Sequence, residues 1–346
     1  MVSQTGYGIT WNILQPKGGM YYHKYSTIAR STQQREEDAP SPQLKRMLAK
    51  RPHLELTGSI TLEGEYPVYS GTHSESWKAT RNEKPVRAKV MRYIGYASDV
   101  ERCTSFEQGI INGIEKWEAL SHPNIVPFLG CSRGFGTTLT LVYPWLSGGN
   151  ALDYVKSHPE ANRLKIVAEV ADGLSYLHGH NVVHGDLRCN NVLIHESASG
   201  PVAMISDTGV AISMGFDGST DQDHGAERWI SLQYAAPGNV EEEISSMLTP
   251  ESDVWSYGMF VYELFTEKPP LDERQSHFRL AWVLRRGEVP QYPGVDSEAA
   301  QRGLSQDAWE LVQSCWDAER TRRPSATQIA VKTKALCSSR IMIAEN

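Results

Sequence analysis

Strand-like and helix-like patterns occupy separate parts of this 346-residue chain. Short runs between residues 58 and 146, among them "SESWKAT" and "TTLTLVYPWL", predict successive antiparallel strands. One helix interrupts them and ends near "EKWEALSHPN", while beyond Gly148 the patterns are helical. Strands followed by helices predict an α+β bilobal fold, with a small β-rich lobe, a larger α-helical lobe and a ligand site between them.

Two helices define the larger lobe. In "NRLKIVAEVADGLSYLHGH" the apolar residues recur at helical spacing. They are Leu164, Val167, Ala168, Ala171, Leu174 and Leu177. The segment 252–266, "SDVWSYGMFVYELFT", is apolar nearly all round. That pattern predicts a helix buried in the middle of the lobe.

The first part of the chain differs in composition from the rest. Residues 1–55 are rich in Gly, Gln, Ser, Pro and charge, as in "STQQREEDAPSPQ". This composition predicts a mostly flexible extension with one short helix at "SPQLKRMLAK". The folded domain is expected at 56–338, followed by a tail at 339–346.

Composition also excludes several classes of protein. The formal charge of −7 argues against a general nucleic-acid binder. No apolar run approaches the roughly 20 residues needed to cross a bilayer, and the first residues do not read as a secretory signal. The five cysteines are scattered without CxxC spacing, which indicates a reducing compartment. A cytoplasmic protein is therefore expected, with a nuclear location left open and neither a membrane nor nucleic acid as partner.

One loop carries the strongest chemical signal. In "VVHGDLRCNNVLI" Asp186 stands two residues after His184 and five before Asn191. Six further motifs follow a fixed order: "VRAK", "HPNIVPFLG", "SDTG", "YAAPG", "SDVWSYG" and "CWDAERTRRP". Together they resemble a protein kinase of the tyrosine-kinase-like group, over roughly residues 58–335. The resemblance implies an N-lobe at about 56–143 and a C-lobe at about 147–338.

The resemblance also implies ATP and Mg²⁺ as cofactors, with a role for each motif residue. Asp186 would accept or orient the proton of the attacking hydroxyl. Asn191 and Asp207 would hold Mg²⁺ through oxygen ligands. Lys89 would fix the α- and β-phosphates, and Arg188 would neutralise the γ-phosphate.

Adenine is expected to lie against the segment that joins the lobes. By register, Tyr143 is the bulky gatekeeper, and the Pro144 carbonyl and the Leu146 N–H would meet the edge of the base. The phosphate-covering loop reads "YSGTHSES", in which Gly71 alone is a glycine in register. Side chains at the other positions keep backbone amides away from phosphates, so weaker nucleotide binding is expected.

The helix glutamate that would pair with Lys89 is replaced. Its position, nine residues before His122, is Gly113. Glu115 lies two residues further, about 200° around a helix, so it is expected to face away. This is the most damaging departure, because efficient transfer needs both the ion pair and the metal site.

Three milder departures concern regulation. Gly185 replaces the arginine that reads an activation-loop phosphate, which predicts control without that phosphorylation. Thr208 replaces the aromatic residue of the metal-binding motif. Arg323 lacks its glutamate, for which Glu241 or Glu242 would substitute.

The motifs favour a weakly active protein kinase that acts on protein substrates. Ser231, where a threonine normally contacts the catalytic loop, favours Ser/Thr over Tyr acceptors. The alternative is a pseudokinase that binds nucleotide or signalling partners as a scaffold. An aspartic protease is a remote rival, since "AMISDTGVA" has no second DTG or DSG to supply the paired carboxylate.

Overall fold

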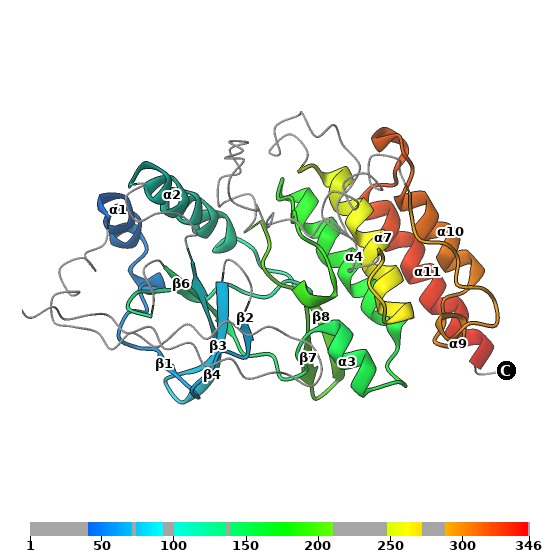
Figure 1. Ribbon diagram of the computed structural model, residues 1–346, viewed down its shortest axis with the longest axis horizontal. Coiled ribbons are helices and arrows are strands. Elements are labelled where there is room, and N and C mark those ends of the chain that lie inside the picture. The colour runs from blue at the N-terminus through cyan, green and yellow to red at the C-terminus, as the bar shows by residue number, and fades with distance from the viewer. Residues whose placement is uncertain are drawn as a thin grey trace, which may run out of the picture. The chain divides into compact units, whose positions relative to one another are not determined.

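The computed structural model of the protein describes six stretches of the chain. They are residues 41–70, 74–92, 100–135, 139–209, 248–271 and 288–344. All belong to one compact unit, Pro40–Asn346. Within it, an antiparallel sheet and a long helix form the small lobe, and helices form the larger lobe (Figure 1). The predicted α+β bilobal fold is confirmed.

The small lobe is built on a sheet of order β1-β3-β4-β6-β5, with β2 pairing to β3. Its strands are β1 (Thr61–Leu62), β2 (Tyr69–Ser70), β3 (Ser74–Arg81), β4 (Lys84–Met91), β5 (Gly130–Ser132) and β6 (Thr140–Pro144). All described pairs are antiparallel. The edge strand β5 is short, and its three residues pair with β6.

Alternation along these strands gives the sheet two different faces. One face is apolar and packs into a small core of its own. That core contains Leu56, Ile60, Ala79, Val86, Ala88 and Val142. The opposite face presents Ser76, Arg87, Lys89 and Tyr143, which neighbour one another through the pairs Ser76↔Lys89 and Arg87↔Tyr143. We call this second surface the site face.

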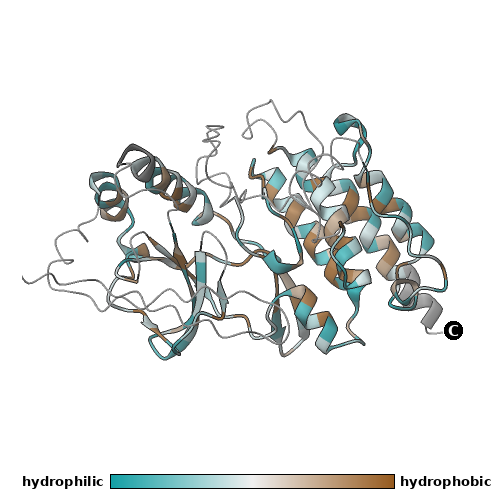
Figure 2. Ribbon diagram, viewed as in Figure 1, coloured by the Kyte–Doolittle hydropathy of each residue, from teal (hydrophilic) through white to brown (hydrophobic). Residues whose placement is uncertain are grey.

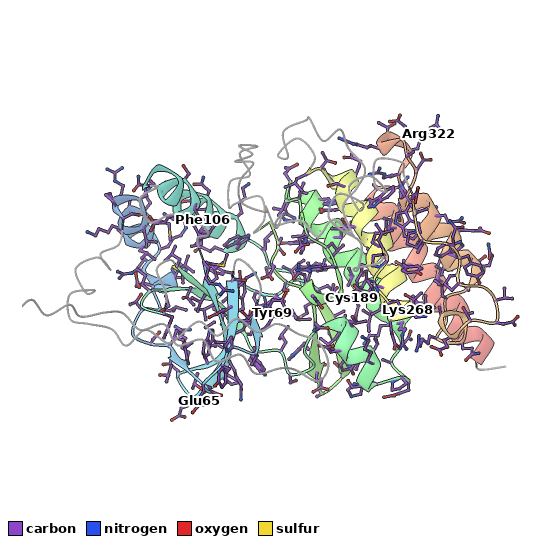
Figure 3. The ribbon with its side chains drawn as sticks, viewed as in Figure 1. Glu65, Tyr69, Phe106, Cys189, Lys268 and Arg322 are labelled. Atoms are coloured by element: carbon purple, nitrogen blue, oxygen red, sulfur yellow. The ribbon has the colours of Figure 1, made fainter. Side chains whose placement is uncertain are left out.

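The helix α1 (Pro42–Lys50) belongs to the folded unit and not to a flexible extension. Ser41 caps it by accepting a hydrogen bond from the Leu44 N–H at 3.2 Å. Its apolar residues Leu44, Met47 and Leu48 are buried in the main core, to which α2 (Val100–Trp117) contributes Phe106, labelled in Figure 3. The helix was expected, and it lies in the unit that begins at Pro40, ahead of the boundary expected at residue 56. Its apolar stripe needs α2 to cover it.

Helices around a small hairpin make up the larger lobe. The bounds are α3 (Ala151–Ser157), α4 (Arg163–Gly179), η3 (Cys189–Asn191), β7 (Val192–Ser197), β8 (Gly200–Ile205), α7 (Pro250–Thr266), α9 (Glu298–Gln301), α10 (Gln306–Cys315), η4 (Arg320–Arg322) and α11 (Ala326–Ala344). The predicted stripe of α4 is buried where that helix packs against α7, α11 and β8. Figure 2 shows hydrophobic residues gathered where these helices meet.

Helix α7 is buried along most of its length, as its sequence predicts. It begins at a capping box in which Thr249 and Ser252 bind each other's backbone N–H. Gly258 allows close packing, because a Cβ there would lie 2.6 Å from Nε1 of Trp316. Among the described residues, no helix is long and apolar enough to cross a membrane.

Candidate functional site

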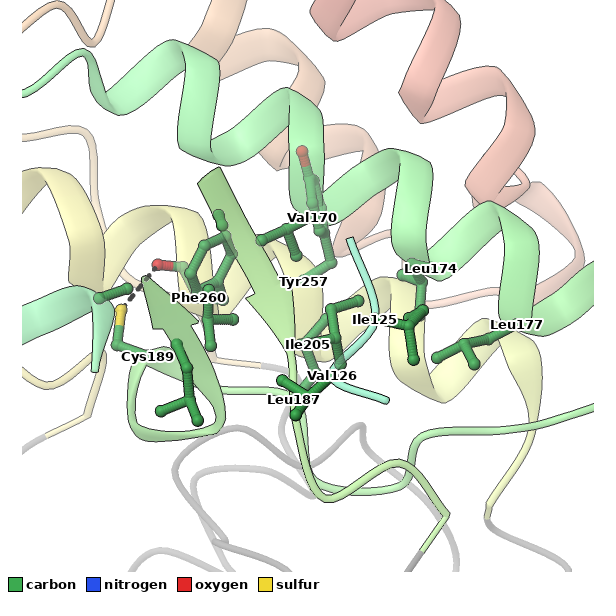
Figure 4. Packing of buried hydrophobic residues seen from close by; sticks show 14 of the residues in the cluster. Ile125, Val126, Val170, Leu174, Leu177, Leu187, Cys189, Ile205, Tyr257 and Phe260 are labelled. Carbon is green, nitrogen blue, oxygen red and sulfur yellow. Dashed lines mark hydrogen bonds between the residues drawn. The ribbon is translucent and has the colours of Figure 1, made fainter. Parts of the chain in front are cut away.

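The motif loop lies between α4 and β7 and is anchored by its apolar residues. Leu187 and Cys189 are fully buried in a cluster that α4, α7 and β8 also line, and Cys189 Sγ lies 3.7 Å from the Phe260 carbonyl oxygen (Figure 4). Asp186 and Arg188 alternate with these buried residues and are partly exposed. Packing thus turns the two polar side chains away from the core.

A carboxylate in the first turn of α7 fixes the backbone of this loop. The buried Asp253 accepts hydrogen bonds from the N–H groups of His184 and Gly185 at 2.7 and 2.8 Å. It also accepts one from Nε2 of His178 at 2.9 Å. Gly185 has a φ of 84°, in the left-handed region that glycine adopts without strain. The glycine in place of the usual arginine therefore suits the backbone of this loop.

A second buried acid of α7 supports the same loop. Glu263 accepts a hydrogen bond from the Cys189 N–H at 3.1 Å. Sequence reasoning missed both Asp253 and Glu263. The available signal was an acidic residue inside a helix that is otherwise apolar nearly all round, because buried charges need partners.

His184 joins the loop to the end of β8. It is fully buried, and its Nδ1 accepts a hydrogen bond from the Asp186 N–H at 3.1 Å. Its Nε2 donates to the Ser206 carbonyl at 2.8 Å. One neutral imidazole satisfies both bonds and holds Asp186 close to the segment that leads into Asp207.

The Asp186 carboxylate is oriented by its neighbours. Nδ2 of Asn191 donates to Oδ2 and to the backbone carbonyl of Asp186, each at 2.8 Å. Nε of Arg188 lies 3.3 Å from the same Oδ2. These contacts fix the direction of the carboxylate, as a proton acceptor requires.

Lys89 and Asp207 form a buried ion pair, with Nζ 2.8 Å from Oδ2. Burial would raise the pKa of Asp207, but the charges of Lys89 and Arg87 outweigh it and lower that pKa to about 2. Burial lowers the pKa of Lys89, against the attraction of Asp207. The lysine thus contacts a residue from the other lobe in place of a helix glutamate.

The oxygen atoms near Asp207 fit a magnesium ion. Oδ1 of Asp207 is buried and makes no hydrogen bond to any described residue. Asn191 uses its amide nitrogen on Asp186, which leaves its side-chain oxygen available. The backbone brings the two residues together, because Ser206, next to Asp207, donates to the Asn191 carbonyl at 2.8 Å. Two hard oxygen donors at one place match what Mg²⁺ prefers.

The site face contains a second cation that sequence reasoning missed. Arg87 lies two residues before Lys89 on β4, and the same alternation that places Lys89 there places Arg87 beside it. Its Nε and Nη2 donate to Oγ of Ser76 at 3.0 and 2.8 Å. Its Nη2 lies 4.0 Å from Oδ2 of Asp207. The available signal was the position of Arg87 two residues before Lys89, because alternate residues of a strand share a face.

Helix α2 provides no carboxylate to Lys89 from position 113 or from position 115. Gly113 is on its buried side, whereas Glu115 is half-exposed and pairs with Arg51 at 3.1 Å. Arg51 also lies 2.6 Å from Glu118. The helix continues through Gly113 without interruption, so the expectation that Glu115 faces away is correct.

The segment that joins the lobes contains the residues that were expected to contact adenine. Tyr143 is buried, its ring lies 5.7 Å from that of Phe128, and burial raises the pKa of its hydroxyl. Pro144 is the last residue of β6 and pairs with Val86. The Leu146 N–H makes no hydrogen bond to any described residue, so it is available to a ligand.

Several predicted residues lie outside the described part of the chain. They are Gly71, Ser231, Glu241 and Glu242. Arg323 is described and donates to the carbonyls of Asp317 and Glu251, each at 2.9 Å, and stacks on Trp255. Thr208 is buried beside Asp207.

Comparisons with known proteins agree with this geometry. The family model described as "Protein tyrosine and serine/threonine kinase" matches residues 63–333. Serine/threonine-protein kinase STY46 of Arabidopsis thaliana is 26% identical over 269 residues, which cover 76% of this chain and 42% of that protein. Dual specificity protein kinase zakA of Dictyostelium discoideum is 26% identical over 282 residues, covering 76% and 33%. The human receptor-interacting serine/threonine-protein kinase 1 is 23% identical over 251 residues, covering 69% and 36%. The chain spans less than half the length of these relatives.

Proposed function

The chain belongs to the protein tyrosine and serine/threonine kinase family, and we propose that it transfers the γ-phosphate of ATP to protein hydroxyls. The observation that carries this proposal is the oriented carboxylate of Asp186, fixed by Asn191 and Arg188. Phosphoryl transfer depends on positioning and on charge neutralisation more than on covalent chemistry by the protein. The motif loop, in which the Asp186 carboxylate is already oriented, supplies the positioning.

Each residue has a step that its contacts support. Asp186 accepts the proton of the attacking hydroxyl, and Arg188 beside it stabilises negative charge on the transferred group. Mg²⁺, when bound, neutralises phosphate charge, and Asn191 and Asp207 would hold it. Lys89 exchanges Asp207 for the α- and β-phosphates, because one ammonium group cannot serve both partners fully.

Serine and threonine are the acceptors we propose. Two observations support this preference: the position of Ser231 in the sequence, and the names of the relatives, two of which are called serine/threonine-protein kinases. Ser231 lies outside the described residues, so the preference rests on sequence.

The second candidate is a pseudokinase that acts as a scaffold. The pairing of Lys89 with Asp207 favours it, because both groups are occupied by each other and α2 provides Gly113 where the glutamate would stand. In this alternative the fold presents surfaces to signalling partners and catalyses nothing.

The test combines binding with turnover. The melting temperature of purified protein is followed as ATP is added, with and without Mg²⁺, and transfer of radiolabelled γ-phosphate to a mixture of proteins is measured. A ligand at 100 times its dissociation constant stabilises the folded state by about 2.7 kcal/mol. The proposal expects Mg²⁺-dependent stabilisation that Asp207→Ala removes, and transfer that Asp186→Asn removes.

A surface variant, Asp153→Asn, is the matched control for loss of one carboxylate in the same lobe, since the exposed Asp153 side chain accepts a hydrogen bond from Asn150 at the start of α3. ATP binding that ignores Mg²⁺, together with no transfer above the Asp186→Asn level, would favour the scaffold.

A further inference from the structure

The site face presents two cations to a single carboxylate. Arg87 and Lys89 project from the same side of β4, and both approach Oδ2 of Asp207, at 4.0 and 2.8 Å. Lys89 alone balances the charge of Asp207. The charge of Asp207 therefore does not explain the position of the Arg87 guanidinium, which is held by hydrogen bonds to Ser76.

Arg87 is held in place by a two-pronged contact. Its Nε and its Nη2 both donate to the Ser76 hydroxyl, at 3.0 and 2.8 Å. Ser76 is 1% exposed, so this hydroxyl has no access to water as an alternative partner. The Arg87 side chain itself is only 14% exposed. A planar guanidinium that is bonded at two atoms is fixed in orientation as well as in place.

The path of the Arg87 side chain crosses the area where a nucleotide base would lie. Arg87 starts directly opposite Tyr143, and the next pair along the strands is Val86 with Pro144, at the segment that joins the lobes. The side chain ends near Asp207, at the phosphate end of the proposed site. A nucleotide with its base at Pro144 and Leu146 and its phosphates at Lys89 must pass over the same stretch of sheet.

The chemistry of this stretch is also wrong for a base. Bases and similar flat ligands bind between apolar side chains that exclude water. Here the side chains of β3 and β4 at that place are Ser76 and Arg87, which bind each other. The apolar residues of the same strands, such as Ala88 and Val86, are on the opposite face in a separate core.

We propose that Arg87 fills the base-binding part of the nucleotide site, and that a nucleotide binds only after Arg87 has left Ser76 and Asp207. This inference rests on the proposed function, because it concerns the same site. It makes Arg87 and Ser76 the residues that set nucleotide affinity in this chain. Nothing in it requires phosphoryl transfer to occur.

The cost of moving Arg87 sets the size of the effect. Its departure breaks two hydrogen bonds and leaves the buried hydroxyl of Ser76 without a partner. A hydrogen bond to a charged group is worth about 1.5–3 kcal/mol, which corresponds to roughly tenfold to a hundredfold in affinity. Removing Arg87 together with the Ser76 hydroxyl should recover this factor.

The test is a calorimetric titration with adenosine, in the absence of Mg²⁺. Adenosine carries no phosphate, so its binding reports the space taken by Arg87 and not the attraction between Arg87 and phosphate. The wild type is compared with the double variant Ser76→Val/Arg87→Ala, in which no buried hydroxyl is left unpaired. Arg81→Ala is the matched control, since Arg81 lies on β3 with side-chain alternation that places it off the site face.

The double variant is expected to bind adenosine at least tenfold more tightly than the wild type, and Arg81→Ala to bind like the wild type. Arg87→Lys keeps a cation but cannot make the paired contact with Ser76, so it should show a smaller gain in the same direction. This single variant also carries the test if the double variant does not fold.

Equal or weaker adenosine binding by the variants would overturn the inference, whether or not the wild type transfers phosphate. Tighter adenosine binding by the variants, with no phosphoryl transfer by any of them, would instead leave the inference standing and overturn the proposed kinase activity. The two failures are therefore distinguishable.

Discussion

The candidate site lies between the motif loop of the larger lobe and the site face of the small lobe. These two regions differ in how their polar side chains are paired with hydrogen-bond and ion-pair partners. In the loop, the backbone and the Asp186 carboxylate are held by separate partners: Asp253 accepts hydrogen bonds from two backbone N–H groups, His184 donates to Ser206, and Asn191 donates to Asp186. On the site face, Lys89 and Arg87 share one carboxylate of the other lobe, that of Asp207, whose Oδ1 has no hydrogen-bond partner among the described residues.

The difference teaches where the family's chemistry is retained and where it is altered. The loop that would position a reacting hydroxyl keeps the residues that the resemblance implies and is held by a buried helix. On the surface that would hold the nucleotide, Ser76 and Arg87 bind each other, and α2 has Gly113 where the resemblance implies a glutamate. The expected consequence is competent positioning combined with weak nucleotide binding.

The largest expected effect comes from breaking the support of the loop with Asp253→Asn. The single side-chain oxygen of asparagine cannot accept all the hydrogen bonds that the two oxygens of Asp253 accept. At least one of the buried N–H groups of His184 and Gly185 therefore loses its partner. A loss of about 3 kcal/mol in the free energy of unfolding is expected, because each unsatisfied buried donor costs roughly 1–3 kcal/mol. Urea denaturation measures it.

Asp172→Asn is the control for that variant, since Asp172 lies on α4 and pairs with the exposed Lys334. It should change stability by less than about 1 kcal/mol. Equal losses in the two variants would show that the Asp253 contacts do not support the loop as described.

The ion pair between Lys89 and Asp207 predicts that the free energy of unfolding depends on pH. The pKa of Asp207 is lowered from 3.8 to about 2, so its folded form binds a proton less readily than its unfolded form. The stability this provides is present above about pH 4 and is lost as the pH falls through about 2. A shift of this size corresponds to about 2 kcal/mol.

Urea denaturation at a series of acidic pH values measures this effect. The wild type should lose about 2 kcal/mol more than Asp207→Asn between pH 5 and pH 2. Parallel losses in the two proteins would mean that Lys89 and Arg87 do not hold the carboxylate in its charged form.

The third prediction repairs the site face by Gly113→Glu. Gly113 is on the buried side of α2, at the position where the resemblance implies a glutamate that would pair with Lys89. A carboxylate there would attract Lys89 and release Asp207 for the metal, and replacing glycine also favours the helix. The kcat/KM for ATP is expected to rise about tenfold, equivalent to about 1.4 kcal/mol.

Gly113→Gln has nearly the same shape without the charge, so it should give no such gain. An increase of the same size with glutamine would point to helix stability, and not to the ion pair, as the cause.

The smallest expected effect concerns the outward side of α2. Arg51→Ala removes the pairs with Glu115 and Glu118, which are partly exposed to water. Such pairs are worth about 0.2–1 kcal/mol each, so a loss below roughly 2 kcal/mol is expected, with kcat unchanged. Thermal denaturation measures it beside Arg46→Ala, an exposed change on α1, the helix that ends next to Arg51. A fall in kcat would mean that this contact sets the position of α2 for catalysis.

The sequence predicted the bilobal fold, the buried stripe of α4 and the outward direction of Glu115, because each depends on periodicity or on motif spacing. It did not predict that α1 packs on α2, since a nine-residue amphipathic helix in a polar segment looks the same whether or not a partner covers it. Asp253 and Arg87 were missed for a different reason. Their importance comes from groups more than 60 residues away in sequence, Gly185 and Asp207, to which no local pattern points.

The most direct test of the central claim is the rate of γ-phosphate transfer by the wild type as ATP is raised from micromolar to millimolar concentration, with Mg²⁺ present. We predict a rate that Asp186→Asn abolishes and that still rises with ATP in the millimolar range, because the loop is competent and the nucleotide is held weakly. Saturation at micromolar ATP would contradict the obstructed site face. Transfer indistinguishable from that of Asp186→Asn at every ATP concentration would contradict the competent loop.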